Sequence, residues 1–453
     1  MTNDMTTGKI LPLILRFAFP VFIGNLLQQV YNLTDAVIVG RYLGTTAIAG
    51  LGASSSVQFM VLGFCIGLSS GFGVPTAKYF GAGKYREMRS CVFHSLVLAA
   101  GLAVLVTTLC TVLCASILHV LKVPAEIYPD AYSYLLILFF GLPFTILYNL
   151  DASLLRAVGD SRTPFYLLVF STILNVLLDL LCILVLQLGC AGAAAATVIA
   201  QAVSGIGGLV IIWKKFAILR PKKEECHLVK ARVKEMLGVG VPVGLQFSIT
   251  GIGNMVMQSA NNALGSCYVS GFTVGIRIKS LTMGPFDALA TGVSVFGSQN
   301  FGAGKMDRVR EGLKKGVTIG VSYGILSGLL LIFGGTAMSR LFIRADAYQA
   351  EAVLAASAKY LRCMGYFYWL LGILNIVRMA TQSLGFSGRA MFAGVMEMFA
   401  RIAVCTLLIG SLGYTAICFA DQAAWVAAVA YIVPICAYSL KAADKRLHSG
   451  RDA

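Results

Sequence analysis

The segment Phe80-Gly81-Ala82-Gly83-Lys84 recurs without change as Phe301-Gly302-Ala303-Gly304-Lys305. Each copy follows a long apolar stretch and precedes a basic helix start. Pro20 lies 60 positions before the first copy, and Pro242 lies 59 positions before the second. Self-similarity at a long, fixed spacing indicates an internal repeat. We therefore predict two similar halves, in which each copy forms a tight turn between two helices.

These turns are not phosphate-binding loops. Tyr85 and Met306 follow the two lysines, where such a loop has Ser or Thr, and the turns follow apolar helices rather than strands. Further along the chain, Gly159 matches Gly385, which extends the repeat.

The composition is that of an integral membrane protein. Of the 453 residues, 58% are hydrophobic and 12% are charged, whereas soluble domains carry about 25% charged residues. We predict an all-α polytopic membrane protein with twelve transmembrane helices in two pseudo-symmetric six-helix lobes. The expected spans are 12–40, 47–79, 89–120, 128–155, 164–187, 191–213, 236–263, 268–300, 311–340, 348–382, 390–410 and 413–440.

The repeat and the spans divide the chain into four parts. We expect an N-lobe at 1–213, a basic linker at 214–235, a C-lobe at 236–440 and a tail at 441–453. Six spans in each half is an even number, so both halves enter the membrane from the same side and the repeat is parallel. No cleavable signal pattern precedes the first span, which we expect to direct insertion itself.

The basic residues indicate the orientation. Lys and Arg in alternate connections number 25 on one side and 4 on the other, the four being Arg41, Lys122, Arg340 and Arg344. We expect a protein of the plasma (inner) membrane. By the positive-inside rule, its linker and both termini are expected on the cytoplasmic side. The net charge of +16 is therefore mostly a topology signal. No clustered basic domain indicates nucleic-acid binding.

A polar stripe lies inside the first span. Gln28, Asn32 and Asp35 are four and three positions apart, so they share one helix face. An ionised Asp at the bilayer centre costs about 3 kcal/mol and usually faces a cavity or the bundle interior. Pro20 removes a backbone hydrogen bond in the same helix and is the expected hinge.

More oxygen donors lie in the N-terminal half. Asn175 and Asp179 are four positions apart, as are Thr197 and Gln201, so each pair shares a helix face. Asp35, Asn175, Asp179 and Thr197 form a set of two carboxyls, an amide and a hydroxyl that suits a shared proton or a sodium ion. The alternative is that both aspartates are hydrogen-bonded core residues.

The C-terminal half lacks this set. Asp35 aligns with Val256 or Met257, Asn175 with Arg401, and Asp179 with Cys405.

This half offers other charges instead. Glu397 and Arg401 are four positions apart, which predicts an intrahelical ion pair with a structural role, or else a role in transport. Asp287 and Asp421 are weaker candidates. Near Asp287, two basic side chains are expected to snorkel or to pair with it, namely Arg277 and Lys279.

A cavity for varied organic compounds needs adaptable walls, which methionine and aromatic side chains supply. Ordinary helix packing is the alternative for each candidate. The predicted lining residues are Gln28, Tyr31, Asn32, Tyr148, Asn149, Phe247, Met255 and Met257.

These motifs together resemble the multidrug and toxic compound extrusion (MATE) family, in its prokaryotic DNA-damage-inducible-type branch. The residues that carry the resemblance are Gly24 to Gln29 with Asp35, Gly40-Arg41, Arg156 to Ser161, Asn175, Asp179, Ala193 to Thr197, and Ser298 to Asn300. The resemblance implies cation-coupled export of organic, often cationic compounds. It also implies bending of the first span near Pro20 and a cation site at Asp35, Asn175, Asp179 and Thr197.

The leading hypothesis is therefore a monomeric antiporter that exports organic cations in exchange for protons or sodium ions by alternating access. The alternatives are a flippase for lipid-linked saccharides and a passive channel. The twelve cysteines form no CxxC pair and the four histidines are scattered. We therefore expect neither enzymatic activity nor a cofactor.

Overall fold

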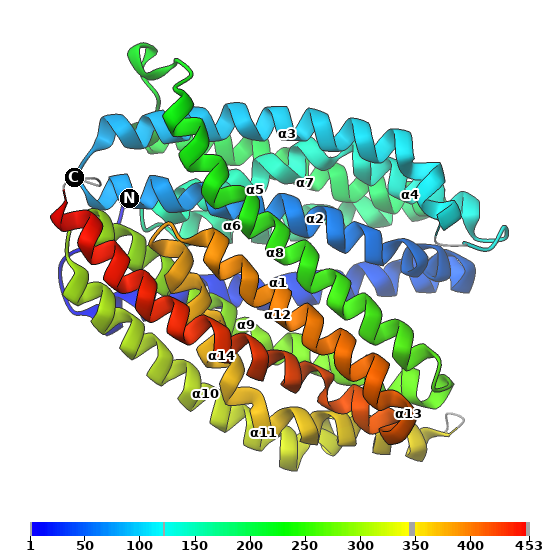
Figure 1. Cartoon of the computed structure of the whole chain (residues 1–453). Helices are drawn as coiled ribbons and strands as arrows, with labels where there is room; N and C mark the ends of the chain where they lie inside the picture. Colours follow the sequence, from blue (N-terminus) through cyan, green and yellow to red (C-terminus); the bar gives the residue numbers. More distant parts are fainter. Residues whose placement is uncertain (1, 121–122, 344–348, 450–453) are drawn as a thin grey trace. The chain divides into compact units, whose positions relative to one another are not determined.

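The computed structural model describes residues 2–120, 123–343 and 349–449, and every regular element among them is a helix (Figure 1). Lys122, Arg344 and Arg451 of the charge count lie outside these residues. The first half contains α1 (Ile10–Tyr42), α2 (Gly44–Gly81), α3 (Tyr85–Val120), α4 (Tyr128–Phe140), α5 (Leu142–Ala157), α6 (Arg162–Leu180), the π-helical η1 (Leu181–Val185) and α7 (Gly189–Lys215). The second half contains α8 (Lys230–Asn262), α9 (Ser266–Gly302), α10 (Met306–Arg340), α11 (Ala350–Ser383), α12 (Ser387–Ala403), the π-helical η4 (Val404–Leu408), α13 (Ile409–Leu412) and α14 (Tyr414–His448).

Each of the twelve predicted spans falls on a helix or on consecutive helical segments. Within the described ranges, ten helical stretches are long and apolar enough to cross a membrane, and α4 with α5 makes an eleventh span that is bent by 49°. The bend lies at Gly141, where Pro143 follows and a Cβ atom would lie 2.3 Å from Val198 of α7. The twelfth is α9, which is 37 residues long but carries several charged residues.

The internal repeat is present in the backbone. Gly83 and Gly304 close the two identical turns with φ values of +68° and +73°. The matched pair Gly159 and Gly385 has the same φ, +81°, in both halves. A side chain at such a φ is strained, so glycine is required for these turns. The predicted repeat and its tight turns are confirmed.

The described chain forms two compact units. Unit 1 is Met1–Thr7 with Phe19–Ser248, and unit 2 is Gly8–Ala18 with Ile249–Ala453. The units therefore differ from the predicted lobes 1–213 and 236–440 by two exchanged helix segments. The boundary in α1 falls directly before the predicted hinge at Pro20.

Close glycine contacts explain both exchanges. In unit 2, a Cβ atom at Gly292 of α9 would lie 3.2 Å from the Ile14 carbonyl oxygen of α1. In unit 1, a Cβ atom at Gly71 of α2 would lie 2.6 Å from the Cα atom of Gly240 in α8. Small residues let the helix backbones approach closely, as in other membrane bundles.

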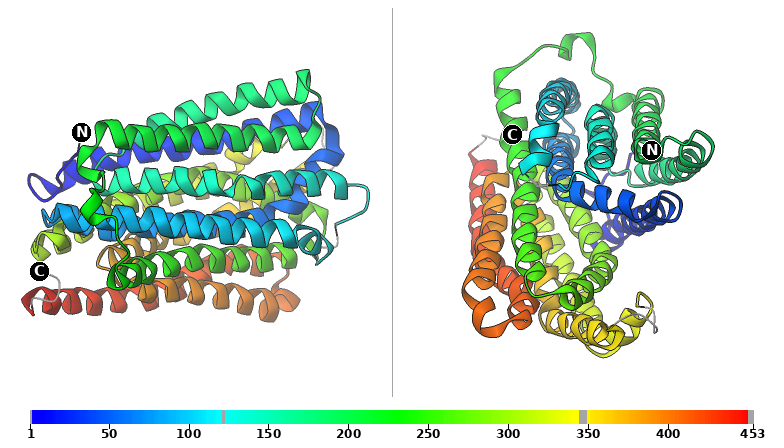
Figure 2. Two further views of the ribbon diagram at one scale, coloured as in Figure 1. Left: turned by 90° about the horizontal axis from the view of Figure 1, so that it is seen from above. Right: turned by 90° about the vertical axis from the view of Figure 1, so that its right-hand side faces the viewer.

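Within each unit, the long helices run side by side (Figures 1 and 2). In unit 1, α2, α5 and α7 are neighbours around a core that includes Phe72, Leu150 and Leu154. In unit 2, α9, α10, α11 and α14 are neighbours around a core that includes Tyr368 and Trp425.

The predicted basic linker docks on unit 1. Glu225, which is 4% exposed, accepts two hydrogen bonds from Arg89 of α3, Nη2–Oε1 at 2.6 Å and Nε–Oε2 at 2.8 Å. The Val229 N–H donates to His94 Nε2 at 2.9 Å. Bidentate Arg–carboxylate pairs are among the stronger polar contacts, so they hold this linker in place.

Candidate functional site

Asp35 of α1 and Asp179 of α6 form a carboxyl pair in unit 1. The two side chains are within hydrogen-bonding contact of each other. Asp179 is fully buried and Asp35 is half-buried. Two carboxylates this close repel each other, so the pair requires a shared proton or another cation.

Asn175 and Thr197 complete this site. The Asn175 amide is oriented so that both its nitrogen and its oxygen have hydrogen-bond partners. In this orientation Asn175 Nδ2 donates to Asp179 Oδ2 at 2.9 Å, and Asn175 Oδ1 accepts from the Thr197 N–H at 3.2 Å. The Tyr31 hydroxyl lies 3.3 Å from Thr197 Oγ1. The four residues predicted to couple ions therefore lie together. Tyr31, which was expected only as a cavity residue, joins them.

One oxygen atom of each carboxyl group in the Asp35–Asp179 pair can still accept a hydrogen bond or bind a cation. Oδ1 of Asp35 and Oδ1 of Asp179 are buried, and no described residue forms a hydrogen bond with either atom. Among the described residues, neither carboxyl forms an ion pair with a basic side chain. The two atoms that remain available are carboxyl oxygens, which suit a proton or a hard cation such as sodium.

The other cavity candidates are placed as follows. Gln28 Nε2 donates to Asn32 Oδ1 at 3.4 Å, on a partly exposed face of α1. On α5, Asn149 Nδ2 donates to the Thr145 carbonyl at 2.8 Å, and Tyr148 is half-buried beside it.

Two further candidates are packed against their own unit. Phe247 covers Gly67 of α2, where a Cβ atom would lie 2.8 Å from its Cδ2 atom, although 39% of the side chain stays exposed. Met257 is 2% exposed and belongs to the hydrophobic core of unit 2, which is ordinary packing. Met255 is half-buried.

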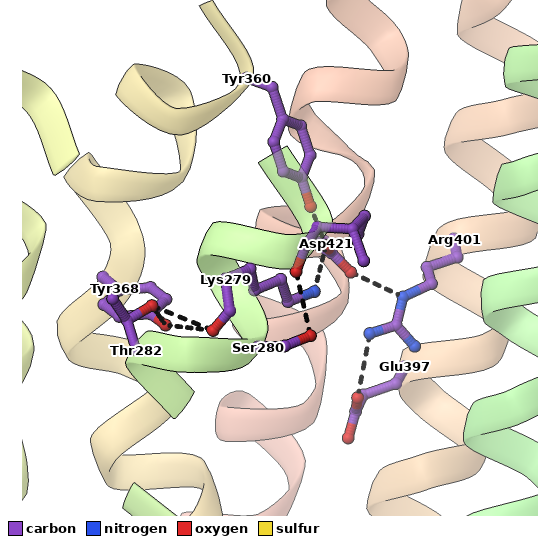
Figure 3. Close-up of polar contacts among 9 residues, drawn as sticks. Lys279, Ser280, Thr282, Tyr360, Tyr368, Glu397, Arg401 and Asp421 are labelled. Atoms are coloured by element: carbon purple, nitrogen blue, oxygen red, sulfur yellow. Dashed lines mark hydrogen bonds and ion pairs between the residues drawn. The ribbon is translucent and has the colours of Figure 1, made fainter. Parts of the chain in front are cut away.

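Unit 2 has a buried charge cluster around Asp421 of α14 (Figure 3). Asp421 Oδ2 accepts hydrogen bonds from Lys279 Nζ at 2.5 Å and from the Tyr360 hydroxyl at 2.8 Å. Asp421 Oδ1 accepts from Arg401 Nε at 3.1 Å. Three helices besides α14 therefore donate hydrogen bonds to one carboxylate, and two of them, α9 and α12, also neutralise its charge.

This contradicts the expected partner of Lys279. Asp287 lies eight residues further along the same helix, about 12 Å away, whereas Asp421 of the neighbouring helix is in direct contact. Asp287 is exposed and instead accepts from Asn375 Nδ2 at 3.3 Å.

The cluster extends through Glu397 of α12. The predicted pair with Arg401 is confirmed at 3.3 Å, but Arg378 Nη1 of α11 is closer to Glu397, at 2.9 Å. Arg378 also donates to Asn375 at 2.6 Å, which links the cluster to Asp287. Equal numbers of acidic and basic side chains take part: Asp287, Glu397 and Asp421 with Lys279, Arg378 and Arg401.

Comparison with known proteins places this chain in a family. A sequence model of the family MatE matches residues 20–181 and again residues 242–407. The two matches begin at Pro20 and Pro242, the prolines of the internal repeat.

This chain belongs to the MATE family. It is 31% identical to the probable multidrug resistance protein YpnP of Bacillus subtilis (strain 168). The aligned 375 residues cover 82% of this chain and 82% of that protein. It is also 23% identical to the FAD transporter of Shewanella oneidensis, over 346 residues that cover 75% of this chain and 76% of that protein.

A solved structure shares the MATE fold. It is described as the outward-facing conformation of a multidrug resistance MATE family transporter of the MOP superfamily. The TM-score is 0.91 at 20% identity, covering 98% of this chain and 99% of that one. The predicted twelve-helix fold is confirmed, and the chain is a multi-pass membrane transporter.

Two residues of the charge cluster in this MATE protein, Arg378 and Tyr360, were not predicted from the sequence. Arg378 is a charged residue near the middle of an apolar span, and that contrast was a visible signal. Tyr360 has no such signal, because tyrosine is common in membrane helices and only its contact with Asp421 reveals its role.

Proposed function

We propose that this MATE transporter exports organic compounds, mainly cations, in exchange for protons or sodium ions by alternating access. The observation that carries the proposal is the Asp35–Asp179 pair, which has no basic partner among the described residues. A transported ion can supply the missing positive charge and can leave again. Release of the ion restores a negative site that attracts a cationic compound.

The contrast with unit 2 supports this assignment. Its carboxylates at positions 397 and 421 are already neutralised by lysine and arginine side chains that cannot leave. Such a cluster needs no exchangeable ion, and we assign it a structural role. Breaking one partner of a buried ion pair is costly, which agrees with that role.

The proposed motion is in α1. Pro20 is inside the helix, and the unit boundary falls between Ala18 and Phe19. A proline weakens the helix locally, so bending there is cheap. Substrate and coupling ion would each favour a different shape of α1, which makes their binding mutually exclusive, as antiport requires.

The test is efflux from proteoliposomes in which the proton gradient and the sodium gradient are imposed separately. A cationic dye and an anion such as FAD are both offered, because relatives are named for drugs and for FAD. Uphill transport of the dye driven by one gradient is expected. Flux that only follows the substrate gradient would show a channel instead.

The matched variants are Asp35→Asn and Glu397→Gln, each of which keeps the shape and removes the titratable group. Asp35→Asn is expected to abolish gradient-driven efflux with normal insertion in the membrane. Glu397→Gln is expected to keep its ion dependence, provided that it inserts equally well. Wild-type efflux and ion dependence in Asp35→Asn would refute the proposal.

A further inference from the structure

Asp151 of α5 is a carboxyl group outside the site described above. It is 0% exposed, and it faces α7 at Gly208, where a Cβ atom would lie 2.9 Å from Asp151 Oδ2. Glycine at this position leaves room for the carboxyl group. Among the residues that the structure describes, neither carboxyl oxygen of Asp151 has a hydrogen-bond partner. The Leu209 N–H lies close enough to act on the group, but it already belongs to the backbone ladder of α7.

In the described part of the chain, no counter-charge compensates this group. Its own helix carries Tyr148 and Arg156. The helices packed against α5 carry further titratable residues, which are Cys65, Lys78 and Tyr79 on α2, Tyr85, Arg86, Glu87, Arg89, Cys91, His94, Cys110, Cys114 and His119 on α3, Tyr128, Asp130, Tyr132 and Tyr134 on α4, Arg162, Tyr166 and Asp179 on α6, and Cys190, Lys214 and Lys215 on α7. Within the described chain, none of them forms an ion pair or hydrogen bond with Asp151. An isolated carboxylate costs several kcal/mol to bury. The group must therefore hold a proton or bind a cation.

A polar line on α7 joins this carboxyl to the ion site. Thr197, Gln201, Ser204 and Gly208 follow a spacing of four, three and four, so they share one face of the helix. The first of them contacts Tyr31 at the ion site. From Thr197 to Gly208 the line covers 11 residues, about 16 Å.

The members between the two ends are polar. Gln201 is half-buried and accepts a hydrogen bond from Thr145 of α5. Ser204 is 1% exposed, and its Oγ atom has no hydrogen-bond partner among the described residues. Two unpartnered polar groups therefore lie one helical turn apart on the same line, namely the Ser204 hydroxyl and the Asp151 carboxyl facing Gly208.

We propose that Asp151 is a second proton-binding site of this transporter, connected along α7 to the Asp35–Asp179 pair. An incoming proton forms an O–H bond with one carboxylate oxygen and later leaves by the same bond, with no change in oxidation state. A proton is the right occupant, because one carboxyl and one hydroxyl offer too few oxygen ligands for a metal cation. The inference rests on the proposed function, since it requires ion-driven transport.

The main test uses Asp151→Asn, which keeps the size of the side chain and cannot titrate. In purified wild-type protein, infrared difference spectra across a pH jump are expected to show a protonated carboxyl band that this variant lacks. Proton release measured with a pH-indicator dye is expected to fall by one group per molecule. An identical band and identical release in both proteins would overturn the inference.

Ser204→Ala is the second variant, because it removes only a hydroxyl and keeps the helix intact. It is expected to slow the proton uptake that the dye reports while leaving the carboxyl band present. Unchanged proton-uptake kinetics in this variant would show that protons do not pass along the polar line on α7. Asp35→Asn separates the two proposals: if it abolishes efflux while Asp151→Asn retains the wild-type spectrum, the proposed function stands and this inference fails.

Discussion

Single side chains decide how each unit handles buried charge. Asp421 is held by Lys279, Tyr360 and Arg401, so its charge is compensated by the protein itself. Asp179 meets a second carboxyl instead, and no described residue forms a hydrogen bond with the Asp151 carboxyl. The same residue type is therefore structural in one place and available to a transported ion in another, because the neighbouring helices differ.

Replacing Lys279 with Met tests the structural role of the cluster. The change leaves Asp421 with less positive charge around it, and breaking a buried pair costs about 3–5 kcal/mol. A clear fall in melting temperature in detergent is expected. The matched control is Arg277→Met, two residues away on the same helix but exposed, which should stay within about 0.5 kcal/mol of wild type. Equal stability of the two variants would contradict a structural cluster.

The linker contact predicts a pH dependence. Hydrogen bonds from Arg89 hold the pKa of Glu225 below its ordinary value. The Arg89–Glu225 contact therefore stabilises the docked linker fully when the pH is above the ordinary carboxyl pKa. This stabilisation is lost as the pH falls through the lowered pKa of Glu225.

Limited proteolysis of the linker at decreasing pH measures this effect. Cleavage of the wild-type linker should rise on acidification, whereas Glu225→Gln should be cleaved readily at every pH. Glu224→Gln alters the exposed neighbour and should behave as wild type. A pH-independent wild-type linker would count against the Arg89 contact.

At the scale of elements, glycines set the distance between α10 and α11. A Cβ atom at Gly328 would lie 2.5 Å from the Gly365 carbonyl oxygen, and one at Gly324 would lie 2.5 Å from the Cα atom of Trp369. Backbone atoms cannot move aside as a flexible side chain can. The contact of these two helices thus depends on the absence of side chains.

Gly328→Ala should destabilise the protein by about 1–3 kcal/mol, because the added methyl group forces the two helices apart. Gly334→Ala is the control in the same helix, where the added atom meets only Leu330 Cδ1 at 3.4 Å. That change should be neutral or stabilising by up to about 1 kcal/mol through helix propensity. Thermal unfolding in one detergent compares the two. The opposite order of stability would exclude the proposed close packing.

For the whole molecule, the distribution of charge predicts the orientation in the membrane. The basic residues gather in alternate connections, and the linker at 214–235 holds eight of them. We expect this linker in the cytoplasm and the end of α10 on the opposite side.

Reporter fusions test this orientation. A fluorescent-protein fusion after Lys222 should be bright, because it folds in the cytoplasm, and an alkaline-phosphatase fusion there should be inactive. A fusion after Arg340 should give the reverse pattern. An active phosphatase at Lys222 would overturn the predicted topology.

The sequence by itself determined the twelve spans, the two repeated halves and the close approach of Asn175 and Asp179. These features depend on local properties, namely hydropathy over about one span, identical short turns and the four-residue period of a helix. The Glu397–Arg401 pair was predictable for the same reason, since both residues lie on one helix. Only the tertiary structure paired Lys279 with Asp421 and left Asp151 without a hydrogen-bond partner in the described part of the chain. Those relations join different helices, and residue spacing along one helix does not say which other helix will lie beside it.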